Sequence, residues 1–295
     1  MNNNSLTQQL MNLYKSQIDS WEELKTNVNN LSFIKKKEFL INDALIKVQF
    51  NPCRVTSTLA KIDPESIAKR KCFLCKENLP KKQVGFTWNN EYLVLCNPKP
   101  IFPYHFTVSH IDHIPQDINN RESDFINLVQ ELKGKFTLLF NGAKAGASAP
   151  DHFHFQICPT NELPVFSRIK KIYPQNSFFQ LSIAKKNFNV VLSNNIEEAI
   201  TKLKQLAYLD IKAKEIDSGL VNILGTMIDE KICLVIAQRE KHRPSCYTNN
   251  DEEKQILVSP ASVEMAGVFI TAKESDFNKL NSEIIINIYN EVLAS

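Results

Sequence analysis

Apolar residues recur at three- and four-residue spacing near the start of the chain, which is the period of an amphipathic helix. These positions are Leu6, Leu10, Leu13, Ile18, Trp21 and Leu24. Ser5 followed by Gln8 fits a capping box, so the pattern predicts a helix over residues 5–27. The next segment, FLINDALIKVQF at 39–50, carries apolar and β-branched residues on both sides of an Asn-Asp pair and predicts a hairpin.

The rest of the first half alternates short apolar runs with a single helical pattern. Periodicity is absent from 51 to 90, so we expect a long loop region there. Strand patterns follow in EYLVLCNP (91–98), HFTVSH (105–110), FTLLFNG (136–142) and HFHFQICP (152–159), with a helical pattern over about 122–133. This order predicts an α+β fold with an antiparallel sheet.

The second half repeats the same succession of strands and helices without the paired histidines of the first. After a polar connection around 160–186 come the strand NFNVVL (187–192), a helix over about 196–208, the hairpin VNILGTMIDEKICLVIAQ (221–238), the strand VEMAGVFITA (263–272) and a helix over about 275–293. We therefore expect two related lobes, at 1–165 and 166–295, with the second completing a cleft begun by the first.

Composition and charge narrow the function classes. The chain has 295 residues, 43% of them hydrophobic and 23% charged, and a net charge of only +3. This balance argues against a general nucleic-acid-binding protein and favours small-molecule partners. No apolar stretch approaches the roughly 18 residues of a membrane helix, so we expect no membrane partner. Seven cysteines and an N-terminus without a signal pattern predict a cytoplasmic location.

The segment NGAKAGASAPDHFHFQ (141–156) contains the strongest candidates for an active site. If it ends in a strand, His152, His154 and Gln156 share one face while the two intervening phenylalanines enter the core. The preceding glycines and Ser148 form a loop that can turn backbone amides and a hydroxyl toward an anion. The alternative is a strand whose polar face merely meets solvent. The fixed order of loop, serine, histidines and glutamine favours a site.

The arrangement N-G-x(3)-G-A-S followed by H-x-H-x-Q resembles the active-site signature of the histidine-triad superfamily, in its transferase and phosphorylase branch. That branch includes the galactose-1-phosphate uridylyltransferases, diadenosine tetraphosphate phosphorylases and GDP-L-galactose phosphorylases. The segments at 97–116 and 259–277 also resemble parts of these enzymes. As a whole, the chain resembles an uncharacterised bacterial family placed beside them.

The resemblance implies a galactose-1-phosphate uridylyltransferase-like fold and assigns roles by position. His154 would be the nucleophile that takes up a nucleoside monophosphate, and Gln156 would hold the phosphoryl oxygens. Imidazole suits the first role because its neutral form is abundant at pH 7. The implied phosphate-binding residues are Asn141, Gly142, Gly146 and Ser148. Arg54 could also contact phosphate, although a structural ion pair explains it equally well.

Cys72 and Cys75 form a C-x-x-C pair, which is the second candidate site in the sequence. To bind zinc, such a pair needs two further ligands. The resemblance implies that His113 and His152 supply them, giving a closed, structural Cys2His2 site. His110 competes with His113 for one position. The alternative is a metal-free loop that contains two reduced cysteines.

The sequence thus predicts a nucleotidyltransferase of phosphorylase type, acting through a covalent nucleotidyl-histidine on a nucleotide sugar or dinucleoside polyphosphate, with phosphate as acceptor. Two alternatives remain open, a hexose-1-phosphate uridylyltransferase and a non-catalytic nucleotide-binding zinc scaffold. The monomer and the homodimer both remain open. For His105 we favour a hydrogen-bonded histidine in the sheet, and for the basic cluster at 239–243 a solvated surface.

Overall fold

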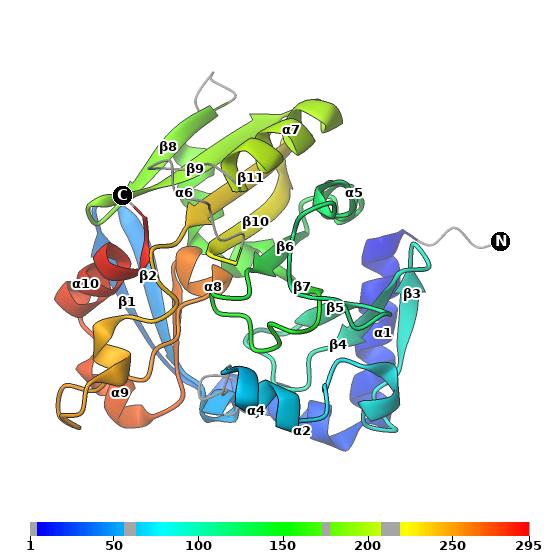
Figure 1. The fold of residues 1–295 in the computed structure, drawn as a ribbon, viewed down its shortest axis with the longest axis horizontal. Helices are drawn as coiled ribbons and strands as arrows, with labels where there is room; N and C mark the ends of the chain where they lie inside the picture. The colour runs from blue at the N-terminus through cyan, green and yellow to red at the C-terminus, as the bar shows by residue number, and fades with distance from the viewer. Residues whose placement is uncertain (1–4, 56–62, 173–177, 208–218, 295) are drawn as a thin grey trace.

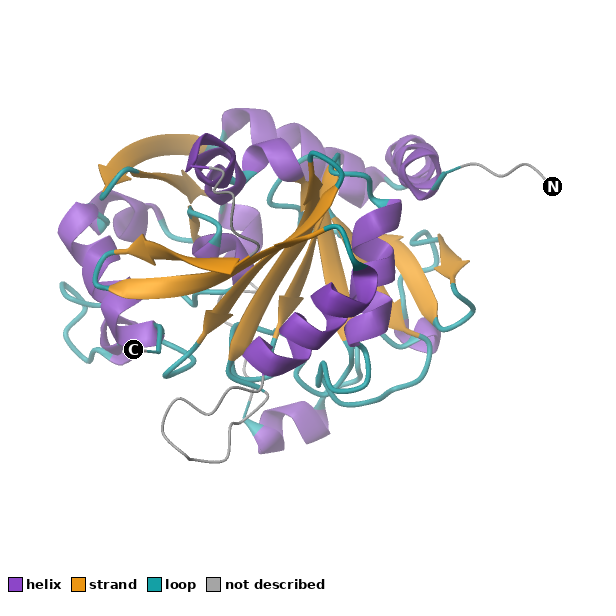
Figure 2. Ribbon diagram, turned by 90° about the horizontal axis from the view of Figure 1, so that it is seen from above, coloured by secondary structure: helices purple, strands orange, loops and turns teal. Residues whose placement is uncertain are grey.

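The structure is a computed structural model that describes residues 5–55, 63–172, 178–207 and 219–294. Its centre is a nine-stranded sheet in which every neighbouring pair is antiparallel (Figures 1 and 2). In order across the sheet, the strands are β3 (Gly85–Trp88), β4 (Tyr92–Cys96), β5 (Phe106–His110), β7 (His154–Pro159), β6 (Phe136–Asn141), β10 (Val221–Ile228), β11 (Lys231–Gln238), β9 (Lys186–Ser193) and β8 (Phe178–Ile183). This confirms the predicted antiparallel α+β fold.

A second sheet of three strands lies against one face of the first. It consists of β1 (Lys35–Ile41), β2 (Ala44–Phe50) and β12 (Val268–Thr271), and β12 runs parallel to β2. The hairpin predicted at 39–50 is present, because Asn42 and Asp43 both adopt positive φ, at 47° and 61°. Such a turn matches the right-handed twist of the flanking strands.

Helices cover both faces of the nine-stranded sheet (Figure 2). One face packs against α1 (Leu6–Ser20), α2 (Glu22–Asn30), α5 (Glu122–Glu131) and α7 (Ile196–Ala207). The other packs against the small sheet, α6 (Pro164–Ile172), α8 (Ser262–Met265), α9 (Glu274–Lys279) and α10 (Ser282–Val292). Figure 1 shows α1 beside β3 and β4 at one end of the molecule, with α9 and α10 beside the small sheet at the other.

Several predicted boundaries were wrong. The helix expected at 5–27 ends at Ser20, because Trp21 has extended backbone, and resumes as α2. The C-terminal helix is interrupted in the same way at Leu280. The polar connection at 160–186 contains α6 and β8, and the loop region at 51–90 contains α4 (Pro64–Lys69) and β3. Short 3₁₀ turns occur at Leu31–Phe33, Pro52–Arg54, Lys76–Asn78, Thr160–Glu162 and Ser245–Thr248.

The strand expected at 263–272 begins as the helix α8. Gly267, at φ +94°, then turns the chain into β12. A side chain there would be strained at this φ. Its Cβ would also lie 2.9 Å from the Leu45 carbonyl oxygen of β2.

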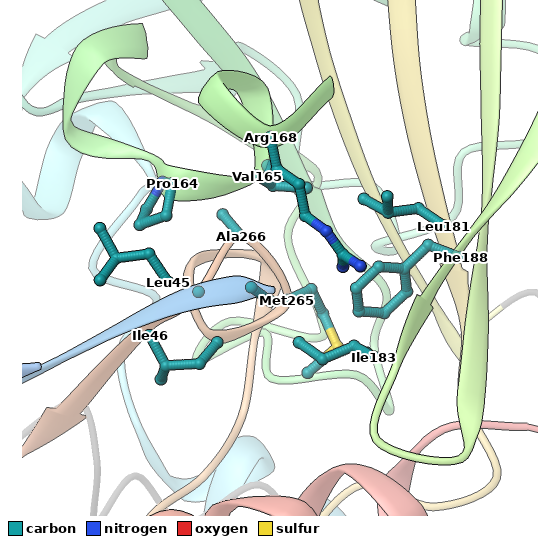
Figure 3. Close-up of a pocket in the computed structure, with 12 residues that line it drawn as sticks. Leu45, Ile46, Pro164, Val165, Arg168, Leu181, Ile183, Phe188, Met265 and Ala266 are labelled. Atoms are coloured by element: carbon teal, nitrogen blue, oxygen red, sulfur yellow. The ribbon is translucent and has the colours of Figure 1, made fainter. Parts of the chain in front are cut away.

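A small apolar cavity of about 20 Å³ lies where β2, α6 and α8 meet (Figure 3). Arg168 closes one side of it and donates to the carbonyl oxygens of Ser182 and Asn42, at 2.6 and 3.0 Å. None of the motif residues at 141–156 lines this cavity. We interpret it as a packing gap between the two sheets.

Strand β7 begins at His154, so His152 lies just before the strand rather than on its face, contrary to expectation. Phe153 and Phe155 are fully buried in the core beneath α1 and α5, as the alternation predicts. His154 and Gln156 point to the opposite side. In the described part of the chain, no helix combines the length and apolar character that crossing a membrane requires.

Candidate active site

A cavity of about 770 Å³ lies beside β5 and β7 and contains the predicted catalytic pair in its wall. His154, Gln156 and Ser148 come from the motif, whereas much of the remaining wall comes from the segments at 66–83 and 95–99. Its cationic lining residues are Arg54, Lys69, Arg70 and Lys99. The cavity is therefore large enough for a nucleotide and favours an anion.

His154 is held in a single tautomer. Its side chain is buried, and its Nδ1 donates to the carbonyl oxygen of His152 at 2.9 Å. Burial lowers the pKa of His154 to about 4, so the ring is neutral near pH 7. Because Nδ1 carries the proton, Nε2 keeps its lone pair. This is the form that an imidazole nucleophile requires.

Gln116 fixes the backbone around His154, and sequence reasoning missed it. Its Oε1 accepts from the His154 amide at 2.7 Å, and its Nε2 donates to the carbonyl oxygens of Asn141 and His154 at 2.8 and 2.9 Å. One buried carboxamide thus ties the end of β6 to the start of β7. The only signal was its place at the end of the family-like segment 97–116, since a lone glutamine in a loop has no periodicity.

Gln156 is bound in turn by His105, which precedes β5. The Nε2 atom of His105 lies 2.9 Å from Gln156 Oε1, and its Nδ1 accepts from the Ile101 amide at 3.2 Å. Burial and the positive charge of Arg54 lower the pKa of His105 to about 3, so this ring is also neutral. The interpretation of His105 as a hydrogen-bonded histidine is confirmed.

The glycine loop packs more closely than an open anion-binding loop. The Gly142 amide already donates to the Val221 carbonyl at 2.9 Å. It is therefore not free to bind phosphate, contrary to what we expected of this glycine. A Cβ at Gly142 would lie 2.4 Å from the Gly219 carbonyl oxygen, and one at Gly146 (φ +93°) would lie 2.6 Å from Ala261 Cβ. Both glycines permit close contact with the second half of the chain.

A smaller cavity of about 60 Å³ adjoins this loop, lined by Asn141, Gly146, Ser148, Gln156 and Arg54 among others. The structure therefore brings these candidate phosphate ligands together. Arg54 lines both cavities, and its Nη1 donates to the Lys99 carbonyl at 2.7 Å. No carboxylate of the described residues lies within ion-pair distance of it. Burial lowers the pKa of Arg54 to about 10, which still leaves it charged at neutral pH.

The Asn141 side chain is oriented by residues of the second half. Its Oδ1 accepts from the Ser262 amide at 2.7 Å and from Asn222 Nδ2 at 3.0 Å. Asn222 is held in turn by the Arg239 guanidinium at 2.6 Å. Arg239 is buried, so the interpretation of its cluster as a solvated surface was wrong for this residue. Its other donors bind the carbonyl oxygens of Lys241, His242, Pro260 and Val292.

Cys72, Cys75, His113 and His152 form a compact cluster beside the cavity, with their ligand atoms all within 4.8 Å of one another. Cys72 Sγ lies 3.2 Å from His152 Nδ1, and Cys75 Sγ lies 3.2 Å from His113 Nδ1. Ligands around a tetrahedral zinc are separated by roughly 3.5 Å, given the usual metal–sulfur and metal–nitrogen distances. The donor set and its spacing therefore fit a metal ion.

The surroundings of the cluster support the same interpretation. His152 Nε2 lies 2.8 Å from the His110 carbonyl oxygen, which places the proton on Nε2 and leaves Nδ1 free as a ligand. His113 Nε2 faces Asp151 at 3.6 Å. The side chain of His110 bonds to the backbone of Asp112 instead, so it lies outside the cluster.

Residues 13–159 match the family described as a domain of unknown function, DUF4922. The structure of yeast Ap4A phosphorylase Apa2 superposes with a TM-score of 0.62 at 15% sequence identity, covering 95% of this chain and 94% of that one. The chain has the fold of an Ap4A phosphorylase. The predicted resemblance to the diadenosine tetraphosphate phosphorylases is thus confirmed for the fold.

Two further structures of the same yeast enzyme match. Its complex with Ap4A gives a TM-score of 0.60 at 15% identity, with 96% of this chain and 97% of that chain covered. Its complex with AMP gives 0.58 at 14% identity, with 95% of each chain covered. A search of the curated proteins found no match.

Proposed function

We propose that this protein is a nucleotidyltransferase of phosphorylase type that works through a covalent nucleotide on His154. The observation that carries the proposal is the state of this ring. It is neutral, it is fixed through Nδ1 to the His152 carbonyl, and it stands in the wall of a 770 Å³ cavity. A neutral imidazole with a free Nε2 in a nucleotide-sized cavity suits attack on phosphorus.

The reaction has two displacements. In the first, the Nε2 lone pair forms a bond to the phosphorus of the nucleoside monophosphate group, and the bond from phosphorus to the leaving oxygen breaks with its electron pair. In the second, an oxygen of inorganic phosphate attacks the same phosphorus, and the P–N bond breaks. The products are a nucleoside diphosphate and the released half of the substrate. Throughout both steps, the proton stays on Nδ1 of the ring and is hydrogen-bonded to the His152 carbonyl oxygen.

The transferring phosphoryl group would be held by Gln156, Ser148, Asn141 and Arg54. Three of these are neutral donors and one is a cation, so they stabilise the phosphoryl oxygens without exchanging protons. Gly142 and Gly146 would act through the shape of the loop. The second half of the chain would complete this part of the site, because Ser259 and Glu264 line the smaller cavity.

A zinc ion would be the occupant of the Cys72, Cys75, His113 and His152 cluster. Four protein ligands leave no open position, so the ion would be structural and would contribute folding free energy. It would tie the loop at 72–75 to the residue two positions before His154. The position of the nucleophile would thus depend on the metal site.

For the substrate we favour a dinucleoside polyphosphate or a nucleotide sugar. Support comes from the cationic cavity and from the fold, which is shared with an enzyme whose structures contain Ap4A and AMP. Uridylyl transfer to a hexose 1-phosphate is the competing activity. It requires the same two displacements and differs only in the acceptor.

The decisive experiment incubates the protein with Ap4A, and in parallel with GDP- and UDP-sugars, in the presence and absence of phosphate. We expect phosphate to raise turnover strongly and isotopically labelled phosphate to appear in the nucleoside diphosphate. Water should compete poorly, because Gln156 cannot take its proton. Nucleoside monophosphate formed at the same rate without phosphate would identify a hydrolase. Binding of these nucleotides without turnover of any of them would identify the scaffold.

A further inference from the structure

The hydrogen bonds around His105 determine which end of the Gln156 carboxamide faces the cavity. The Ile101 amide points at His105 Nδ1, so this nitrogen has a lone pair and the proton of the neutral ring lies on Nε2. His105 Nε2 therefore donates to Gln156 Oε1, at 2.9 Å. The Gln156 Nε2 group is left as the free donor of this side chain. It has no hydrogen-bond partner among the described residues.

This orientation matters because the two ends of a carboxamide have nearly the same shape and opposite polarity. With Nε2 toward the cavity, Gln156 presents two donors to a phosphoryl group. With the amide reversed, it would present lone pairs to an anion. The reversed amide would also place an N–H group against the His105 N–H. The reversed orientation is therefore unfavourable for two reasons.

The carboxamide of Asn141 is oriented in the same way. Asn141 Oδ1 is occupied by the Ser262 amide and by Asn222 Nδ2, which leaves Asn141 Nδ2 for the small cavity. In both cases a buried donor binds the carbonyl end. The recurrence indicates that the two amides are arranged as a receptor for an anion.

We propose that His105 is a positioning residue, which acts through Gln156 to keep the donor end of the carboxamide on the transferring phosphoryl group. The inference rests on the proposed function. It adds a residue outside the H-x-H-x-Q motif to the phosphoryl-binding machinery. His105 itself is buried and is not among the residues lining the 770 Å³ cavity.

Two substitutions separate this role from support of the fold. In His105→Asn, the side-chain oxygen can replace Nδ1 as acceptor for the Ile101 amide, but nothing replaces the donor at Nε2. In His105→Gln, the amide nitrogen reaches the position of the lost donor. The first variant removes the contact to Gln156, and the second is its matched control.

The assay measures phosphorolysis by the full chain of Ap4A, or of the GDP- or UDP-sugar if that is what the protein turns over, with melting temperature followed in parallel. We expect His105→Asn to lower kcat by about 10- to 100-fold, because the receptor partly loses an oriented donor. KM should change little, and His105→Gln should recover most of the rate. In a Gln156→Ala background, His105→Asn should have no further effect, since the residue through which it acts is gone.

The possible outcomes separate the two proposals. If the wild type turns over Ap4A and His105→Asn is equally active, or if both His105 variants are equally impaired, only the positioning role is overturned. If the wild type shows no turnover, binding of AMP by calorimetry replaces the rate. A loss of AMP affinity in His105→Asn that disappears in the Gln156→Ala background would then uphold the positioning role alone. A wild type that turns over neither Ap4A nor the GDP- and UDP-sugars, and that does not bind AMP, would overturn both.

Discussion

Two hydrogen bonds to nearby residues set the orientation of the His154 imidazole. The His152 carbonyl fixes its proton and the Gln116 side chain fixes its main chain, so the ring needs no carboxylate partner. Such an arrangement suits a nucleophile better than a general base, because the proton on Nδ1 has no acceptor stronger than a carbonyl oxygen.

Replacing His154 with Asn should therefore abolish the covalent route. Asn can still bond to the His152 carbonyl but has no nucleophilic lone pair. We expect turnover of Ap4A to fall by roughly 10³-fold or more, while the melting temperature changes little. A near-normal rate in this variant, measured with purified protein in the presence of phosphate, would contradict the covalent mechanism.

We expect the stability of the protein to depend on pH through Glu264. It is buried at the start of α8, where its carboxylate accepts from the Ala261 amide at 2.8 Å and the Ile270 amide at 3.3 Å. Burial nevertheless raises the pKa of Glu264 from 4.5 to about 7. A carboxyl whose pKa is raised on folding stabilises the protein below its unfolded value, and that contribution is lost as the pH rises through the folded value.

Between pH 4.5 and 8, the wild type should thus lose about 3 kcal/mol of unfolding free energy relative to Glu264→Gln. The variant loses one of the two acceptors, but that penalty does not depend on pH. Urea unfolding of both proteins at several pH values measures the difference. A constant difference across this range would show that Glu264 does not titrate as inferred.

At this scale, a sequence reveals residues that belong to a recognisable motif. His154 and Gln156 were found because they stand at alternate positions of the H-x-H-x-Q pattern, with a glycine loop before them. Gln116, Asn222 and Ser262 were missed, because a buried hydrogen-bonding side chain differs from a surface one only through its surroundings.

At the level of elements, side chains along β7 alternate between the cavity that contains the candidate site and the hydrophobic core. Phe155 is fully buried against Phe125 and Tyr92, with ring centroids 5.5 and 5.9 Å away, while its neighbours on the strand face the cavity. Strand periodicity predicted this division, since successive side chains point to opposite faces. It could not predict that His152 lies before the strand, because its place depends on cysteines 80 and 77 positions away.

Phe155→Ala should lower the unfolding free energy by about 3 to 5 kcal/mol through the cavity that it creates. Phe33→Ala is the matched control, since that ring is 83% exposed and its loss should cost less than about 0.5 kcal/mol. Urea titrations of the two variants test this. Equal effects would mean that Phe155 does not pack in the core as described.

The loop that contains Cys72 and Cys75 has little core of its own, since Leu74 and Ala149 are the only other described residues in its buried apolar cluster. We therefore expect one zinc per chain by elemental analysis, and Cys72→Ser should release it and lower the melting temperature. His113→Ala should also lose the metal, whereas His110→Ala should keep it. A metal-free protein with full activity and unchanged stability would remove the zinc from the proposal.

For the whole molecule, the main feature is that one continuous nine-stranded sheet joins the two halves of the chain. Strand β6 of the first half pairs with β10 of the second, with Asn141 opposite Asn222. The order of strands across a sheet is set by contacts between distant segments, so the sequence predicted the strands and their antiparallel character but not this pairing. The pairing lets residues 222, 239 and 262 support a site whose motif lies near 150.

A shared sheet and core should make the two halves unfold together, and the tryptophans allow a direct test. Trp21 and Trp88 both lie in the first half, in the same hydrophobic core as Leu234 of β11 in the second half. Leu234→Ala should cost about 2 to 5 kcal/mol, because Leu234 is fully buried. If the sheet unfolds as one unit, the urea midpoint measured by tryptophan fluorescence should fall by the same amount as the midpoint from circular dichroism. Were the fluorescence midpoint to stay at its wild-type value while circular dichroism showed a second transition at lower urea, residues 166–295 would be an independently unfolding lobe.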